Sequence, residues 1–363
     1  MRIVSSCTLF LVLMQVASSL ALAEVLPQFP QGSVWRQNIS AAAVHPDSAK
    51  MLSTLELLGG FGGNRFQIDF SMRVVHADES APLLKLVSMR DADRNEIYYT
   101  GDCDATGSMV PVPRGAVIEG EDGMRCEEDG DCHYLVKQGN LLFEVYRANV
   151  AGNNIQAQCL ATWNLDVVYP PENRNDHCTS ADAAGMPIAP MLFNADEVQA
   201  SLNIDPSGEG DLGHMIRFIL PNARIARDAQ LGGSSGKLYV RPASHAGNPQ
   251  GPASTVPSGV HLRLLSDFSL DNYNPAARVI LNTLKRYGMV LADGGNIALT
   301  AESDYYTTTK WDELGITSTV FARSQGNRTV RVTDFEVLDT GPRIAETYDC
   351  TPPVPPAGLT SQE

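Results

Sequence analysis

Three carboxylic acids, Glu119, Asp182 and Asp293, lie in segments that suit a catalytic acid or base. Asp182 belongs to a loop of small residues, and Asp293 follows a short apolar run and precedes two glycines. A carboxyl group at a strand end can transfer protons. Asp also caps helices and forms turns, and an Asp–Gly step is typical of a hairpin, so structural roles stay open. The catalytic candidates are these three residues and His214, which we expect to orient or tune one of them.

Basic side chains on or beside predicted strands form a second group of candidates. His133 precedes a predicted strand, and Arg217 alternates with apolar residues in another. His245 and Arg263 come from neighbouring predicted elements. Imidazole and guanidinium groups that converge on one sheet face suit an anionic or polyhydroxyl ligand. We therefore expect these four residues to bind substrate, although a histidine such as His214 on an apolar strand face also fits core packing.

The segment 119–133 is rich in Asp and Glu. Hard cations such as Ca²⁺ prefer oxygen ligands, which makes Asp129 and Asp131 candidate metal ligands. The alternative is a solvated acidic loop held by Cys126 and Cys132. The sequence predicts no required cofactor and leaves Ca²⁺ open.

Hydrophobic periodicity indicates a mainly β protein with a few helices. From residue 66 onward, apolar and polar residues alternate, which is typical of half-buried strands. Two segments have helical spacing, 48–58 and 275–287; Asn274, Pro275 and Gly288 provide start and stop signals for the second. We expect an antiparallel β-sandwich or jelly-roll-like domain, with helix 275–287 packed on a sheet. A single β-rich domain should span 24–350, a small N-terminal subdomain over 24–110 stays open, and the Pro-rich tail 351–363 should be flexible.

Composition excludes several classes of protein. The chain has 363 residues, of which 43% are hydrophobic and 19% charged. Disordered chains and coiled coils have a higher share of charged residues. The formal net charge of −15 argues against a general nucleic-acid binder, which needs a basic surface.

The first residues have the pattern of a secretory signal peptide. Arg2 provides a positive start, residues 9–16 are apolar, and Ala21 and Ala23 match a small-residue cleavage site. We expect cleavage after Ala23 and a secreted or periplasmic protein without a transmembrane segment. An even number of cysteines in an exported chain predicts disulfides, with fifteen pairings open. The six that remain are Cys103, Cys126, Cys132, Cys159, Cys178 and Cys350.

The chain resembles a widespread group of exported bacterial proteins found in myxobacteria, actinobacteria and proteobacteria. The similarity covers most of the mature chain, including Asp131 and His133 and the segments 29–46, 118–120, 142–144, 179–190, 197–198, 214–218 and 287–293. Arg241 stands before Pro242 where the group has an aromatic residue. The resemblance implies export and a shared set of polar positions, and it implies no particular reaction.

The leading functional hypothesis is a secreted carbohydrate-active enzyme, specifically a glycoside hydrolase with two carboxyl groups beside the scissile bond of a poly- or oligosaccharide. A polysaccharide lyase, with His214 or His245 as base and an Arg to neutralise a uronate, is a second hypothesis. A non-catalytic carbohydrate-binding or envelope-structural protein is the third. Only three Trp residues are present, which weakens the case for extensive sugar stacking.

Overall fold

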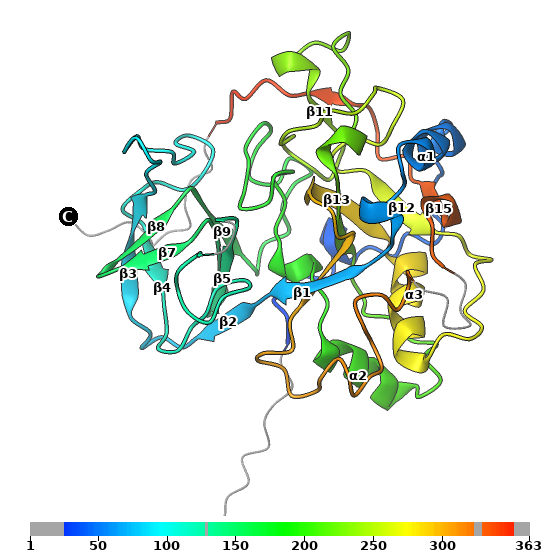
Figure 1. The fold of residues 1–363 in the computed structure, drawn as a ribbon, viewed down its shortest axis with the longest axis horizontal. Helices are drawn as coiled ribbons and strands as arrows, with labels where there is room; N and C mark the ends of the chain where they lie inside the picture. The colour runs from blue at the N-terminus through cyan, green and yellow to red at the C-terminus, as the bar shows by residue number, and fades with distance from the viewer. Residues whose placement is uncertain (1–24, 128–129, 323–328, 352–363) are drawn as a thin grey trace, which may run out of the picture.

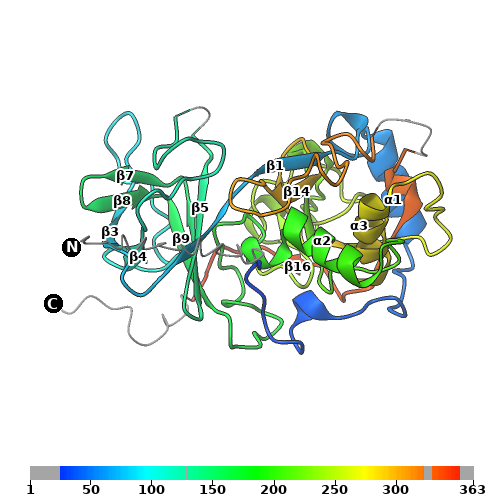
Figure 2. The ribbon, with the colours of Figure 1, turned by 90° about the horizontal axis from the view of Figure 1, so that it is seen from below.

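The computed structural model describes residues 25–127, 130–322 and 329–351. The predicted signal peptide (1–23) and residues 352–363 of the predicted tail lie outside the described residues. Strands predominate over helices in the described part of the chain, as the sequence predicts. Figure 2 shows two four-stranded sheets at one end of the molecule and a six-stranded sheet with the three α-helices at the other.

The six-stranded sheet has the order β1-β14-β10-β13-β12-β15. Its strands come from distant parts of the chain: β1 (Ile68–Met72), β10 (Ile216–Leu220), β12 (His261–Leu264), β13 (Met289–Gly294), β14 (Leu299–Glu302) and β15 (Phe335–Val337). One four-stranded sheet is made of β2 (Val74–Ala77), β5 (His133–Gln138), β6 (Leu141–Tyr146) and β9 (Cys159–Asn164). The other is made of β4 (Met109–Pro111), β3 (Leu83–Ser88), β8 (Asn154–Ala157) and β7 (Asn149–Ala151). A short pair joins β11 (Leu238–Tyr239) to β16 (Ile344–Ala345).

The expectation of purely antiparallel sheets is wrong. Four strand pairs are parallel: β1 with β14, β10 with β13, β2 with β5, and β3 with β8. Alternation predicts that a segment is a strand, but it carries no information about the direction of the partner strand. The sheets are therefore mixed, and the sandwich, jelly-roll and single-domain expectations stay predictions.

The chain first crosses from the six-stranded sheet to the four-stranded sheets at a single residue. Arg73 separates β1 of the six-stranded sheet from β2 of the neighbouring sheet, and Figure 1 shows the two strands in continuation. Buried Glu302 holds this junction, because its carboxylate accepts from the Val74 amide at 3.0 Å and from the Asn194 side chain at 2.9 Å. The junction is thus fixed by hydrogen bonds to a group without exposure to water.

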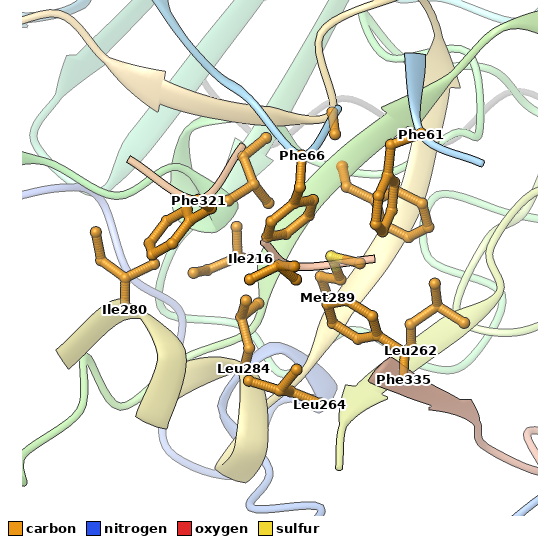
Figure 3. Packing of buried hydrophobic residues seen from close by; sticks show 14 of the residues in the cluster. Phe61, Phe66, Ile216, Leu262, Leu264, Ile280, Leu284, Met289, Phe321 and Phe335 are labelled. Carbon is orange, nitrogen blue, oxygen red and sulfur yellow. The ribbon is translucent and has the colours of Figure 1, made fainter. Parts of the chain in front are cut away.

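Both predicted helices are confirmed, as α1 (Ser48–Leu57) and α3 (Pro275–Arg286). Asn274 caps α3 by accepting from the Ala277 amide at 2.7 Å. Ile280 and Leu284 of α3 pack against strand residues such as Ile216 and Leu262 (Figure 3). A third helix, α2 (Ala195–Ile204), was not expected, although a capping box of Asn194 and Glu197 marks its start.

Three disulfides confirm the prediction from cysteine count. They join Cys103 to Cys159, Cys126 to Cys132, and Cys178 to Cys350. They fit an extracellular setting. No helix within the described ranges has the length and apolar character that crossing a membrane requires.

Replacing Leu284 with Ala should lower the free energy of unfolding by about 2–5 kcal/mol, because it leaves a cavity between α3 and the sheet. Leu57 is the matched control, since it is also helical but 89% exposed. Leu57→Ala should change stability by less than about 0.5 kcal/mol. Denaturant titration with the disulfides intact measures both. Equal effects at the two positions would contradict this packing.

Candidate active site

Two adjoining cavities bring together most of the predicted site residues. The smaller cavity, of about 300 Å³, has Glu119 and His133 on its wall. The larger cavity, of about 620 Å³, has His245 on its wall. Asp131 and Asp293 line both cavities. Residues of the six-stranded sheet and of the neighbouring sheet line the smaller cavity, so the site lies at the junction between them.

A buried ion pair lies at the smaller cavity, whose wall includes Arg217. The guanidinium of Arg217 on β10 contacts one carboxylate oxygen of Asp182 through Nε at 3.1 Å and Nη2 at 3.0 Å. Its Nη1 donates to the Thr300 hydroxyl of β14 at 2.8 Å. Asp182 has no exposed surface, and its Oδ1 has no hydrogen-bond partner. Arg217 lies on the sheet face opposite Ile216 and Phe218, as the strand alternation predicts.

Asp293 reaches the cavities because β13 is irregular beside it. Phe218 pairs with Leu291, but Ile219 pairs with Asp293, so one additional residue of β13 forms a bulge. Bulges redirect side chains and are common next to active sites. One carboxylate oxygen of Asp293 accepts from the Gly294 amide at 2.6 Å, and the other accepts from the Ala183 amide at 3.3 Å. The second bond joins Asp293 to the loop that carries Asp182.

Glu119 and His133 form a second pair on the wall of the smaller cavity, with side chains that are 16% and 8% exposed. His133 Nδ1 lies 2.7 Å from Glu119 Oε2, and its Nε2 lies 3.1 Å from the carbonyl oxygen of Ala181. The other oxygen of Glu119 accepts from the Ser71 hydroxyl at 2.8 Å. His133 opens β5 and Ser71 belongs to β1, so this pair links the two sheets.

The carboxyl groups at the site have opposite pKa shifts. Burial raises the pKa of Asp182 to about 8, against the opposing charge of Arg217 and with a contribution from Asp293. Burial also raises the pKa of Asp293, again against Arg217. Burial alone would raise the pKa of Glu119, but the His133 charge and hydrogen bonds outweigh it, and the net shift is downward. Two carboxyl groups beside one guanidinium therefore retain a proton to higher pH, while Glu119 is readily ionised.

His245, on the wall of the larger cavity, contacts the loop that carries Asp182. His245 Nδ1 lies 2.6 Å from the Ala183 carbonyl oxygen, and its ring packs against Tyr348 with centroids 5.1 Å apart. The position of His245 fits its predicted role in binding substrate, which stays a prediction.

Two predicted site residues lie elsewhere. His214 is on neither cavity wall; its Nε2 is 3.6 Å from Glu197, and its Nδ1 is 2.9 Å from the Met215 carbonyl oxygen. It lies before the start of β10, outside the strand in which it was expected, and its contacts are with Glu197 and Met215 instead of the catalytic candidates. Arg263 pairs with Glu336 at 2.7 Å and donates to carbonyl groups of the N-terminal segment. These partners indicate a structural role for Arg263 in place of the predicted role in binding substrate.

The metal candidates have unequal support. Asp131 lies on both cavity walls, whereas Asp129 lies outside the described residues. Among the described residues, one close group of metal-ligand types is found, Glu121 with Cys126 and Cys132. A disulfide joins the two cysteines, so their thiolates are not free to bind a metal. Binding of Ca²⁺, which the sequence leaves open, stays untested.

Several cavity residues were not predicted from sequence. Asp69 and Ser71 lie on β1, where the register with β14 shifts, and Thr300 lies opposite Asp69. Their pattern is that of an ordinary half-buried strand, so only knowledge of the parallel pairing would have found them. The larger cavity also has tyrosines on its wall: Tyr99, Tyr146 and Tyr348.

Comparisons with protein-family models, curated proteins and solved structures found no match to this chain. The resemblance to exported bacterial proteins therefore stays a prediction.

The His133–Glu119 pair should make stability depend on pH. Burial opposes charging of His133, but Glu119 dominates and raises its pKa from the ordinary 6.5 to about 9. A raised pKa contributes stability that is complete below the unfolded value and is lost as pH rises through the folded value. The destabilisation by His133→Gln should thus be largest near about pH 6 and shrink by about 3 kcal/mol towards about pH 9.5.

Urea unfolding of both proteins across this range measures the effect. His76→Gln is the control, because burial, followed by the Lys137 charge, lowers the pKa of His76. Its effect should stay constant from neutral to alkaline pH. A constant difference for His133→Gln as well would refute the assignment of a charged imidazole.

Proposed function

We propose that the protein is a secreted glycoside hydrolase that cleaves a poly- or oligosaccharide by acid–base catalysis. Asp293 is the general acid, and Glu119 is the second carboxylate. The observation that supports this assignment is that both groups line the 300 Å³ cavity and have opposite pKa shifts. Environments that separate the pKa values of two carboxyl groups allow one to donate a proton while the other stays ionised.

In this mechanism Asp293 donates its proton to the leaving glycosidic oxygen. The Ala183 and Gly294 amides hold its carboxyl group in place. Glu119 then acts as a base towards water or as a nucleophile, since its ionised form is stabilised by His133 and Ser71. The paired imidazolium also prevents Glu119 from competing with Asp293 for the proton.

Asp182 is a positioning residue in this proposal. It was expected to be one of the two catalytic carboxyl groups, but it has no surface through which it could contact a sugar. Asp182 and Asp293 share one counter-charge, Arg217, so together they retain a proton near neutral pH. Without Asp182, Asp293 would face Arg217 alone and would lose its proton more readily.

The cavity walls favour a neutral sugar over a uronate. Asp69, Asp102 and Asp131 add carboxyl groups to the two walls. Arg217, which a lyase would use to neutralise a uronate, already binds Asp182 and Thr300. These features support hydrolysis over elimination, and they leave binding without catalysis as the alternative outcome of an activity assay.

Asp293→Asn should reduce the release of reducing ends by at least about a hundredfold, because the amide cannot donate the required proton. Reducing ends are measured on cellulose, xylan, mannan and chitin derivatives. Asp271→Asn is the matched control, since Asp271 is an exposed Asp that lines neither cavity and accepts from nearby Ser269. The control should retain full activity.

Three results would count against the proposal. Full activity of Asp293→Asn would exclude this residue as the acid. Unsaturated products would indicate a lyase. Binding of a polysaccharide by the wild-type protein, without any new reducing ends, would indicate a non-catalytic binding protein.

A further inference from the structure

The C-terminal part of the described chain forms a fixed strap at the larger cavity. Within the strap (344–351), β16 pairs with β11, and Cys350 is bonded to Cys178. Between them, Glu346 is fully buried; it accepts from the Ala246 amide at 2.9 Å and lies 3.0 Å from His177 Nδ1. Cys178 directly precedes the first loop that lines the cavity (179–183), and Ala246 lies within the second (245–248). The strap is therefore anchored on both sides of Tyr348.

Tyr348 has a bonded hydroxyl group and is a partly exposed residue. Its hydroxyl donates to the carbonyl oxygens of Ala246 at 3.0 Å and Gly247 at 3.1 Å, and it accepts from Lys237 at 2.6 Å. The residue is nevertheless 38% exposed and lines the 620 Å³ cavity. Because the hydroxyl is satisfied within the protein, a ligand in the cavity would meet the ring, beside which His245 packs with centroids 5.1 Å apart and the Lys237 ammonium lies 5.0 Å from the ring centroid.

The backbone of Tyr348 supports a role in the cavity. Its φ of 59° is in the left-handed region, which is unfavourable for a tyrosine. Such conformations persist where the surrounding structure holds them, and they are concentrated at ligand sites. Here the Glu346 carboxylate accepts from the Tyr348 amide at 2.8 Å and holds this conformation.

We propose that the ring of Tyr348 is a stacking platform for a neutral pyranose unit of the substrate, in a subsite next to Asp293. This inference rests on the proposed hydrolase function. The C–H face of a pyranose is apolar and flat enough to cover an aromatic ring, while its hydroxyl groups need polar partners at the edges. Asn222, Asn248 and Asp102 on the same wall provide such partners.

The subsite adjoins the reacting bond because the two cavities meet at Asp293. Tyr99, which is 41% exposed, lines the same cavity and is the second exposed aromatic there. Two tyrosines in place of the tryptophans usual in sugar clefts would account for binding in a chain with few Trp.

The test measures binding separately from cleavage. In the Asp293→Asn background, calorimetry with cellohexaose, xylohexaose, mannohexaose and chitohexaose should identify at least one ligand. Adding Tyr348→Leu, which keeps bulk but removes the flat ring, should weaken that binding about tenfold or more. Tyr348→Phe keeps the ring and should stay within about threefold. Tyr305→Ala is the control, because Tyr305 is 53% exposed and stacks on Arg73 away from the larger cavity; it should leave affinity unchanged.

Each failure has a distinct meaning. Unchanged affinity in Tyr348→Leu overturns the stacking role, whatever the wild-type enzyme cleaves. A tenfold loss in a folded Tyr348→Leu variant supports it even if cleavage assays exclude hydrolysis. Absence of binding to all four hexasaccharides overturns the inference, and reducing-end release by the wild-type protein then decides separately whether the hydrolase proposal survives.

Discussion

The buried charge of Arg217 is the constraint on which the site depends. A guanidinium without access to water is stable only with paired carboxylates and satisfied hydrogen bonds. Asp182 and Thr300 provide direct bonds, and the Asp293 carboxyl group interacts electrostatically with the same guanidinium. The same arrangement places one more carboxyl group beside Arg217 than its charge can balance. Retention of a proton near neutral pH follows from that excess.

The fold places the charge of Arg217 near a second pair, Glu119 with His133, in which the pKa of the carboxyl group is lowered instead of raised. The chain passes from β1 of one sheet to β2 of the next through Arg73. Ser71 of β1 therefore lies close enough to the neighbouring sheet to donate a hydrogen bond to Glu119. Irregular register occurs on both sides of the site, within β1 after Asp69 and within β13 before Asp293. A site at the junction of two sheets, with bulges that redirect polar side chains, is consistent with a groove for an extended substrate.

Part of this arrangement could be predicted from the sequence. His133 opens a strand, Asp293 lies at the end of one, Glu119 begins a segment rich in acidic residues, and the loop around Asp182 is rich in small residues, so local patterns identify them. The alternation of apolar and polar residues also predicts that Arg217 and Phe218 lie on opposite faces of the sheet. What local patterns lack is pairing between distant segments. The parallel partners of β1 and β10 lie over 70 residues away in the chain. The sequence therefore could not place Asp69, Ser71 and Thr300 together at the site. It also could not exclude His214 from the site.

The strap that carries Tyr348 illustrates the same limit, because its position depends on a disulfide and on β11–β16 pairing across a long stretch of chain. These long-range constraints give the cavity its walls, while the local sequence provides the groups that act in it. The chemistry and the binding surface therefore have separate structural origins, and they can be altered separately.

Carbon-13 NMR titration of carboxyl-labelled aspartates tests the central claim most directly, in the wild-type protein and in Asp182→Asn. The account predicts that the wild-type protein retains one buried Asp carboxyl whose pKa lies far above the ordinary 3.8. In Asp182→Asn, that high titration should disappear and Asp293 should titrate at lower pH, because Arg217 then faces it alone. If every wild-type Asp carboxyl titrates below about pH 5, the shared proton does not exist and the acid–base assignment is contradicted.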